Sequence, residues 1–347
     1  MLLYIHIPFC DSKCYYCAFN SFTNFDNYKE EYFNSLIKQF QYEIARFNLK
    51  KGLIETLFIG GGTPSTIGIK LYKRLFNIIT PYLKKDCEIT IEANPNRINS
   101  EWLNGILNLG VNRLSLGVQS FNNKKLQFLG RTHSAKMAIN GIEMAKKIGF
   151  SNISIDIIYN TAIDNKKLLK NDIDIAISLG VSHISGYSLT IEKGTKFFKS
   201  NNKNLSNRDF SKFVIENIVN SGLKQYEISN FGKISKHNFG YWQYKNYIGI
   251  GSGAVGFLNN RRIYPNKSIK AYIKNPLEFK EEFLTEKDIL TEKLFLGFRS
   301  IIGVKKSLIQ NKKINTLLNE GLIVEKGDRY YNTNFLIADE ITLFLID

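Results

Sequence analysis

The chain has 347 residues, of which 47 are Lys or Arg and 31 are Asp or Glu, so its formal net charge is +16. This length excludes a single small module and allows one large α/β domain with a smaller module, or two medium domains. The basic residues form no long run, so we expect no specific nucleic-acid site. No apolar run reaches roughly 20 residues and the first nine residues lack a basic start, so we expect a cytoplasmic protein without a membrane span or a signal peptide.

Short β-branched or aromatic runs alternate with longer amphipathic stretches over the first 225 residues. The runs predict strands at 2–8, 54–60, 87–93, 111–118, 151–159 and 181–189. Apolar residues spaced by three and four predict helices between them, for example at 28–47, 70–84, 134–148 and 206–221. Such alternation indicates parallel strands joined by crossovers, in an open doubly wound sheet or a β/α barrel.

Polar residues and glycines gather where these predicted strands end. They are Cys10, Gly60 to Thr63, Glu92, Gln119 and Asp156. In parallel α/β architectures the carboxyl ends of the strands form the ligand-binding edge. We therefore expect one site that draws residues from five strand ends.

The pattern changes after about residue 225. Residues 226–257 are rich in Gly, Tyr and Asn and predict loops with a short strand, and residues 278–347 predict a helix, a second helix, a hairpin over "EKGDR" and a closing helix. This order is that of a winged-helix-like module, and because it lacks a concentrated basic helix we expect it to cap or to mediate interactions. The predicted parts are 1–225, 226–277 and 278–347.

Three cysteines occur within eight residues, Cys10, Cys14 and Cys17, with the spacing C-x3-C-x2-C. In a reducing compartment such a cluster favours metal or redox chemistry over disulfides. Three thiolates on one loop can hold a [4Fe-4S] cluster and leave one iron open to a small molecule. Zinc stays an alternative, because Cys87 or His6 could supply the fourth ligand that a structural zinc site needs.

The cysteine spacing resembles that of the radical S-adenosylmethionine (SAM) superfamily. The resemblance implies a partial (β/α)6 barrel in which SAM binds the open iron and is cleaved to a 5′-deoxyadenosyl radical. It extends over nearly the whole chain and is closest to the oxygen-independent coproporphyrinogen III oxidase group, in particular to its heme-chaperone subgroup. The matching motifs are "YIHIPFC" (4–10), "GGGTPS" (60–65), "IEANP" (91–95), "RLSLGVQSF" (113–121), "LGRTH" (129–133), "YSLTIEKGT" (187–195), "YEISNF" (226–231) and "HNFGYW" (237–242).

The resemblance also implies the residues that bind SAM. Glycines of "GGGTPS" would let the backbone approach the methionyl group, Glu92 would pair with its ammonium or with ribose hydroxyls, and Arg131 is suited to a carboxylate. The complete implied set is Tyr4, Tyr16, Ala18, Gly60, Gly61, Gly62, Thr63, Glu92, Gln119, Arg131 and Asp156.

"HNFGYW" resembles a signature associated with heme binding in the chaperone subgroup. There His237 would ligate heme iron and the aromatic rings of Tyr241 and Trp242 would pack on the macrocycle. The other histidines, His6, His133 and His183, lie in family motifs, and we expect them to be structural.

Two loops depart from the family pattern. "IIYNTAID" (157–164) lacks the usual Gly-Pro turn, which alters the loop at 159–164. "GSGAVGF" (251–257) lacks a histidine, which alters the loop at 254–257.

Two functions follow from the resemblance: a carrier that passes heme to respiratory hemoproteins, or an enzyme that decarboxylates coproporphyrinogen III. The oxidases carry a longer arm before the cluster and a further Cys two positions after the third, where this chain has Phe19. Both differences favour the carrier. An electron donor for the cluster is implied, and a peripheral membrane contact, a homodimer and a radical enzyme acting on an unrelated substrate stay open.

Overall fold

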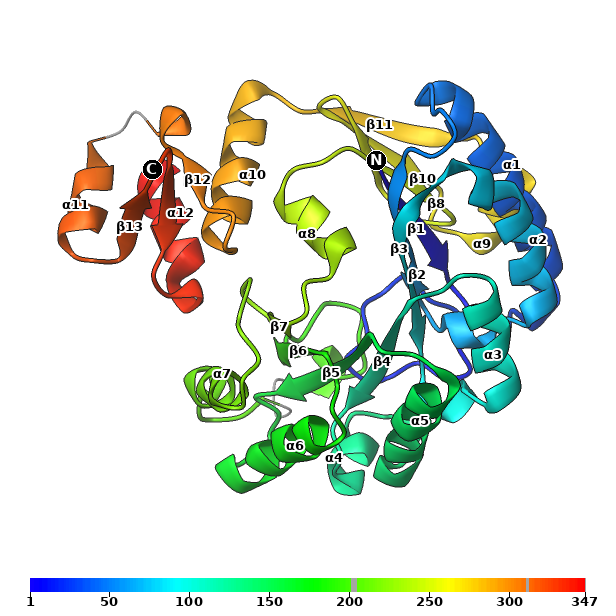
Figure 1. Ribbon diagram of the computed structural model, residues 1–347, viewed down its shortest axis with the longest axis horizontal. Helices are drawn as coiled ribbons and strands as arrows, with labels where there is room; N and C mark the ends of the chain where they lie inside the picture. The colour runs from blue at the N-terminus through cyan, green and yellow to red at the C-terminus, as the bar shows by residue number, and fades with distance from the viewer. Residues whose placement is uncertain (201–204, 310–311, 347) are drawn as a thin grey trace.

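The computed structural model describes residues 1–200, 205–309 and 312–346. Within these residues, eleven strands form one sheet in the order β11-β10-β9-β8-β1-β2-β3-β4-β5-β6-β7. Figure 1 shows that this sheet is strongly bent, with helices along its outer side and the short helix α8 on its inner side.

Six parallel strands form the centre of the sheet in chain order. Their bounds are β1 Leu2–Ile7, β2 Ile54–Gly61, β3 Leu83–Ala93, β4 Arg113–Gln119, β5 Ile153–Tyr159 and β6 His183–Ser188. All six predicted strands are confirmed. Because the strand order never reverses and the helices cover one face, the architecture is a partial barrel and not an open doubly wound sheet.

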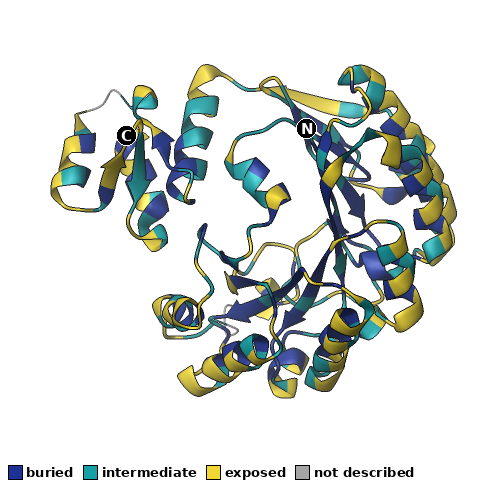
Figure 2. Cartoon of the chain, in the orientation of Figure 1, coloured by how far each residue is buried: buried dark blue, intermediate teal, exposed yellow. Residues whose placement is uncertain are grey.

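Helices between the strands cover the outer face. They are α1 Lys29–Arg46, α2 Ile69–Ile79, α3 Ser100–Asn108, α4 Asn123–Phe128, α5 Ala135–Ile148, α6 Lys166–Ser178 and, after β6, α7 Ser211–Asn220. Asn99, Asn122, Ser134 and Asn165 cap the N-termini of α3 to α6 by accepting a backbone hydrogen bond. Figure 2 shows the buried sides of these helices turned to the sheet and their exposed sides turned to solvent.

The two faces of the central strands differ in polarity. Leu3, Ile5 and Ile7 of β1 are fully buried in the core beneath the helices. Tyr4 and His6, the alternate residues of the same strand, line the interior of the barrel. The outer face of the barrel wall therefore holds the fold together, and the inner face presents polar groups.

The segment after α7 extends the sheet at both edges. Its elements are β7 Asn230–Gly232, α8 Lys236–Trp242, β8 Tyr247–Ile250, β9 Gly256–Leu258, β10 Arg261–Pro265, α9 Ile269–Lys274 and β11 Phe279–Phe283. Strand β8 pairs in parallel with β1, and β7 pairs antiparallel with β6.

The prediction of loops with one short strand over 226–257 was therefore wrong. The seven-residue helix α8 has little helical propensity of its own, and local contacts stabilise it: Ser235 caps it, and Gly240 packs so closely on Leu2 that a Cβ would lie 2.6 Å from that side chain.

The C-terminal residues have a core of their own, built around Leu294, Phe298 and Ile341. The elements are α10 Glu286–Phe298, β12 Val304–Lys305, α11 Lys313–Asn319, β13 Ile323–Lys326, β14 Arg329–Asn332 and α12 Ala338–Ile346, and the sheet order is β12-β14-β13. The predicted helices and hairpin are confirmed. The three-part division of the chain stays a prediction. Residues 201–204 of its first part, and 310–311 and 347 of its last, lie outside the described residues.

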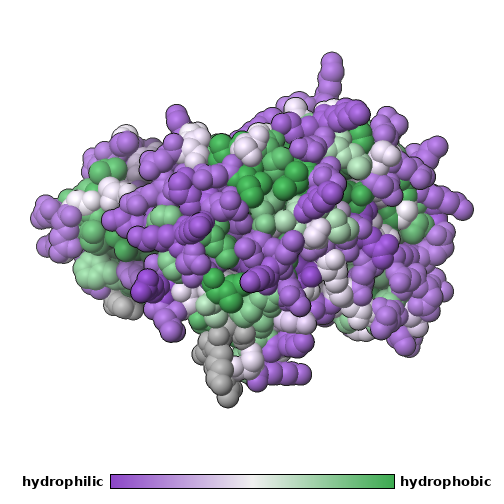
Figure 3. All heavy atoms as spheres, turned by 90° about the horizontal axis from the view of Figure 1, so that it is seen from below, coloured by the Kyte–Doolittle hydropathy of each residue, from purple (hydrophilic) through white to green (hydrophobic). Residues whose placement is uncertain are grey.

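The surface is mainly polar. Figure 3 shows hydrophilic residues over most of the face seen from below, with hydrophobic residues gathered near its middle. Among the described helices, none has the length and apolar composition needed to traverse a bilayer.

Candidate functional site

A cavity of about 1180 Å³ occupies the interior of the barrel and extends from the cysteine loop to α8 and α10. The site residues predicted from the sequence line this cavity except Gly60 and Trp242, so the expected packing of the Trp242 ring on a macrocycle in the cavity is not supported. The prediction that residues from several strand ends share one site is therefore consistent with the geometry. The individual roles of these residues stay predictions.

The three cysteines lie on a loop that is closed at its base. A bridge between Phe9 and Phe22 joins the two ends, and the backbone N–H of Cys10 donates to the carbonyl of Phe22 at 3.0 Å. The Lys13 ammonium donates to the carbonyl of Phe19 at 2.9 Å across the loop. The thiols of Cys10, Cys14 and Cys17 are free and half-buried at the cavity wall.

A chain of hydrogen bonds joins two of the thiols. The Cys10 Sγ and Thr63 Oγ1 atoms are 3.3 Å apart, and the amide of Asn94 donates to Thr63 Oγ1 at 3.1 Å. Arg131 donates to Asn94 Oδ1 at 2.7 Å, to the carbonyl of Gly117 at 2.6 Å and to Cys14 Sγ at 3.4 Å. The Cys14 sulfur thus has a cationic hydrogen-bond donor beside it.

The arrangement of the thiols bears on the choice between a cluster and zinc. Burial raises the pKa of the Cys10 and Cys17 thiols, so metal binding would have to release their protons. Within the part of the chain that the structure describes, no three His, Cys, Asp or Glu side chains converge as ligands of a single ion. A cluster divides its ligands among several irons, whereas a structural zinc site needs four ligands on one ion.

The glycine triplet packs against the protein itself. A Cβ on Gly60 would lie 2.9 Å from the Glu92 carboxyl carbon, and one on Gly62 would lie 2.8 Å from the carbonyl oxygen of Phe9. Gly61 has φ +117 and sits directly against the His6 ring. The absence of side chains thus allows β2 to pack closely on β1 and β3, while Gly61, Gly62 and Thr63 line the cavity.

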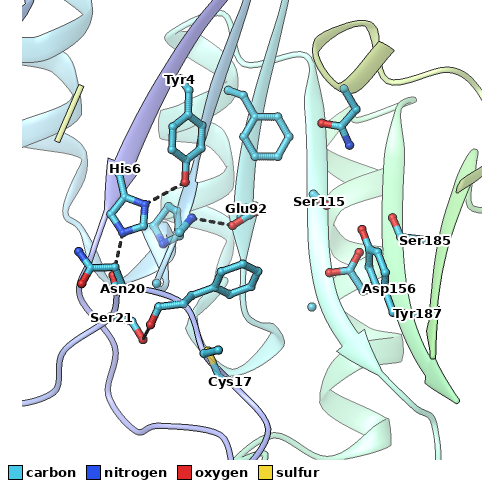
Figure 4. Close-up of a pocket in the computed structure, with 18 of the residues that line it drawn as sticks. Tyr4, His6, Cys17, Asn20, Ser21, Glu92, Ser115, Asp156, Ser185 and Tyr187 are labelled. Carbon is cyan, nitrogen blue, oxygen red and sulfur yellow. Dashed lines mark hydrogen bonds between the residues drawn. The ribbon is translucent and has the colours of Figure 1, made fainter. Parts of the chain in front are cut away.

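Two of the carboxyl groups that line the cavity, those of Glu92 and Asp156, come from the central strands β3 and β5. Glu92 Oε2 accepts from the backbone N–H of Gly61 at 2.9 Å, and Figure 4 shows Asp156 near Ser185 on the neighbouring strand. Burial raises the pKa of Glu92 to about 7 and that of Asp156 to about 6, although Arg113 lowers both. A bound cation, such as an ammonium or sulfonium group, would favour the ionised form of both.

The remaining residues predicted to bind SAM surround these carboxyl groups. Gln119 is buried at the end of β4, where a register shift gives it φ 67, a left-handed conformation that is uncommon for a residue other than glycine. The Tyr4 hydroxyl lies 2.9 Å from His6 Nδ1, and burial raises the pKa of both Tyr4 and Tyr16. Ala18 lines the rim of the cavity.

Both ring nitrogens of His237 have partners within the chain. Nδ1 lies 2.8 Å from Thr56 Oγ1 and Nε2 lies 2.9 Å from the Tyr241 hydroxyl, and the residue is 1 % exposed. Burial lowers the pKa of His237 to about 3, so the ring is neutral. An iron ligand at Nε2 would have to replace Tyr241.

Aromatic rings and ion pairs form the cavity wall around α8. The Tyr241 and Tyr247 ring centroids are 4.7 Å apart, and Tyr247 also contacts Phe257, with 5.9 Å between centroids. Arg262 pairs with Glu292, and Arg299 makes two hydrogen bonds to Asp339. This end of the cavity offers flat apolar surface with ion pairs at its margin, which suits a planar ligand.

The histidines expected to be structural also have partners within the chain. His6 Nε2 lies 2.7 Å from the carbonyl of Asn20, and His133 Nε2 lies 3.0 Å from that of Val118. The His183 ring lies between Ser154 and Tyr226, at 2.7 and 2.8 Å.

The two altered loops have different surroundings. Asp164 of the loop 159–164 is fully buried, with Oδ1 2.7 Å from Lys125 Nζ, and Asp172 of α6 lies 3.8 Å from the same ammonium. This buried ion group holds the loop without a Gly-Pro turn. In the loop 254–257, Val255 and Phe257 line the cavity, so the wall there is apolar.

Sequence reasoning missed several polar residues of the cavity wall. They are Asn94, Arg113, Ser115, Ser185 and Tyr187. The available signal was the alternation in β4, where Arg113, Ser115, Gly117 and Gln119 occupy every second position of an inner strand. A polar stripe of period two on a strand buried on both sides indicates a ligand-facing wall.

The model of the radical SAM superfamily matches residues 4–170. Proteins named heme chaperone HemW are similar over most of the chain. That of Lactococcus lactis is 34% identical over 95% of this chain and 93% of its own length, that of Bacillus subtilis is 35% identical over 89% and 86%, and that of Escherichia coli is 35% identical over 95% and 93%.

Among solved structures, the coproporphyrinogen III oxidase (HemN) from Escherichia coli, described as a radical SAM enzyme, superposes with a TM-score of 0.83. It covers 99% of this chain and 89% of its own, at 19% identity. This likeness shows a shared fold, including the partial barrel predicted from the sequence.

Proposed function

The chain belongs to the HemW family within the radical SAM superfamily, and from this we propose that it is a heme chaperone that binds a [4Fe-4S] cluster, SAM and heme. The observation that carries the proposal is one continuous cavity of about 1180 Å³ with three free thiols at one end and His237 among aromatic rings at the other. This volume exceeds what one drug-sized ligand occupies, so it has room for SAM and a tetrapyrrole together.

At the cluster end, Cys10, Cys14 and Cys17 would hold the cluster. When bound, the cluster and SAM supply one-electron chemistry, for which an external electron donor is needed. The protein contributes orientation and charge: Arg131 donates to the Cys14 sulfur, and Glu92 and Asp156 would pair with the cationic groups of SAM. Gln119 and Tyr4 complete the polar wall.

At the other end, His237 is the proposed axial ligand of heme. Nδ1 keeps its bond with Thr56, which fixes the ring orientation, and Nε2 exchanges the Tyr241 hydroxyl for iron. The neutral ring leaves that nitrogen able to donate its lone pair. Tyr247 and Phe257 would pack beside the macrocycle, and the heme would then pass to a recipient hemoprotein such as a respiratory enzyme.

The test uses the whole chain, reconstituted anaerobically with iron and sulfide. We expect heme to bind at about one equivalent and to transfer to an apo-hemoprotein, and we expect no turnover of coproporphyrinogen III with SAM and a reductant. Turnover without heme transfer would overturn the chaperone assignment in favour of the oxidase. Failure to bind heme in both the reduced and the oxidised protein would overturn it as well.

A further inference from the structure

Arg113 is a buried cation that faces the cavity without a partner. It is the first residue of β4, it is 2 % exposed, and it lines the cavity. In the described residues its side chain makes no hydrogen bond and no ion pair, and its buried Nε has no acceptor. The Nε–H donor of the guanidinium is therefore unsatisfied within the described chain.

The nearby acidic groups are already engaged elsewhere. Glu88 Oε1 accepts from the backbone N–H of His237 at 3.2 Å, and Glu92 Oε2 accepts from Gly61 at 2.9 Å. Asp156 faces the cavity beside Ser185 (Figure 4). The charge of Arg113 lowers the pKa of all three acids, yet none of them pairs with it directly.

An unpaired buried charge is strongly unfavourable, because water no longer solvates it and no counter-ion replaces the water. Such a group is retained where a ligand supplies the missing counter-charge. Arg presents a planar fork of N–H donors that matches a carboxylate, so the missing partner is best described as a ligand carboxylate.

We propose that Arg113 binds a carboxylate of the tetrapyrrole, one of its propionates, at the inner end of the cavity. This assignment rests on the proposed function, which it extends by naming the residue that recognises the acidic edge of heme. Arg113 is a binding residue in this scheme and takes no part in ligating iron.

The acidic end of SAM is placed too far away to be the partner. Arg113 precedes Gln119 by six positions in β4, which at roughly 3.3 Å per residue separates the two by about 20 Å along the strand. The carboxylate of SAM is expected at the cluster, beside Cys14 and Arg131. Arg113 instead lies toward α8, because it pairs with Thr90 of β3, two residues from Glu88, whose carboxylate accepts from the backbone N–H of His237.

The experiment compares ligands that differ only in the acidic groups or in the metal. Heme, heme dimethyl ester and metal-free protoporphyrin are titrated against the wild-type chain and the Arg113→Gln, Arg113→Lys and Arg74→Gln variants. Arg74 is an arginine of α2, on the outer layer, that pairs with Glu30, so Arg74→Gln removes the same charge away from the cavity.

We expect Arg113→Gln to weaken heme binding about 10- to 100-fold, the range for losing a charged hydrogen bond. Binding of the dimethyl ester should change less than about twofold, since it has no carboxylate to lose. The heme affinity of Arg113→Lys should lie between those of the wild type and Arg113→Gln, and that of Arg74→Gln should match the wild type. Equal weakening for heme and its ester, or no weakening for either, would overturn the proposal.

Folding gives a second readout. Because Arg113 has no partner, the ligand-free Arg113→Gln chain should unfold at the same temperature as the wild type or higher. A variant that fails to fold would show that Arg113 has structural partners, which contradicts the proposal.

Protoporphyrin separates this proposal from the proposed function, since it carries the propionates without iron. If the wild type binds protoporphyrin but shows no axial ligation of heme, the iron site is wrong. In that case the carboxylate site is supported if Arg113→Gln weakens protoporphyrin binding and is overturned if it does not. If neither tetrapyrrole binds the wild type, both proposals fail.

Discussion

The cluster end and the α8 end of the cavity each contain an arginine. One has hydrogen-bond acceptors within the chain and the other has none among the described residues. Arg131 donates to Asn94, to Gly117 and to Cys14, so its guanidinium is fixed before any ligand arrives. Arg113 is more deeply buried and has no bond within the described chain.

The same contrast extends to the neighbouring groups. At the cluster end, backbone and side-chain hydrogen bonds hold the thiol loop and Glu92 in position. At the α8 end, a ligand of His237 must replace the Tyr241 hydroxyl at Nε2. A substitution at the cluster end therefore removes contacts that exist without a ligand. A substitution at the α8 end removes contacts that form only with the ligand.

The largest effect is expected at the prebuilt end. Replacing Cys10, Cys14 or Cys17 singly by Ala should abolish the cluster, because two thiolates cannot hold three corners of a cubane. Iron and sulfide content after anaerobic reconstitution, and the visible absorbance of the cluster, measure this directly.

Cys87 provides the matched control. It is buried on β3, and burial raises its pKa to about 12, so it remains a thiol and does not compete for iron. Cys87→Ala should keep the full cluster content. A loss of iron in that variant equal to the loss in Cys10→Ala would contradict the assignment of the ligands.

At the α8 end, His237→Ala should weaken heme binding by about 10- to 100-fold and change the Soret spectrum, since it removes the axial ligand. Tyr241→Phe should bind heme at least as tightly as the wild type, because Nε2 then has no hydroxyl to release. It should lower the free energy of unfolding by only about 1 kcal/mol, the usual contribution of one hydrogen bond.

These two variants decide which ring holds the iron. If Tyr241→Phe lost the heme spectrum and His237→Ala kept it, the phenol would be the ligand and His237 its hydrogen-bond partner. Heme spectra of both variants at one pH are sufficient to distinguish the cases.

A smaller effect is expected from pH. SAM should bind more weakly as pH falls through about 7 and then about 6, where Glu92 and Asp156 take up protons, by up to about tenfold per pH unit for each group. Equilibrium SAM binding between about pH 8 and pH 5 measures it, and Glu92→Gln should remove the upper of the two steps.

The stability of the ligand-free chain should have the opposite pH dependence. Folding raises the pKa of Glu92 from 4.5 to about 7, so ionisation opposes folding, and this residue's contribution falls as pH rises from about 4.5 to about 7. If SAM affinity and ligand-free stability rose together over that range, the raised pKa of Glu92 would be refuted.

The sequence predicted the central strands and the C-terminal module because their patterns are local. β-branched runs recur between amphipathic helices, and "EKGDR" marks a hairpin. Helix α8 escaped prediction because a cap and a close contact between Gly240 and Leu2 stabilise it, and the second of these exists only in the folded chain. The pairing of β8 with β1 likewise joins residues far apart in sequence.

For the site, motifs located the cluster end better than the α8 end. Cys10 follows β1 and Glu92 is the last residue but one of β3, where position alone indicates a ligand, whereas Asp156 lies in the middle of β5. Arg113 opens the motif "RLSLGVQSF", but its burial and its lack of a partner emerge only from three-dimensional packing.

The smallest effect is expected at Phe19, which is 69 % exposed at the rim near Cys17. Phe19→Cys should leave iron content and SAM binding within about twofold of the wild type. The Phe19 side chain contributes little to the loop, because the loop is held there by the hydrogen bond from Lys13 to the backbone carbonyl of Phe19. A further thiol is not needed either, since three thiolates already ligate the three irons that the protein binds. If this one substitution produced turnover of coproporphyrinogen III, the cluster loop and not the α8 end would separate oxidase from chaperone.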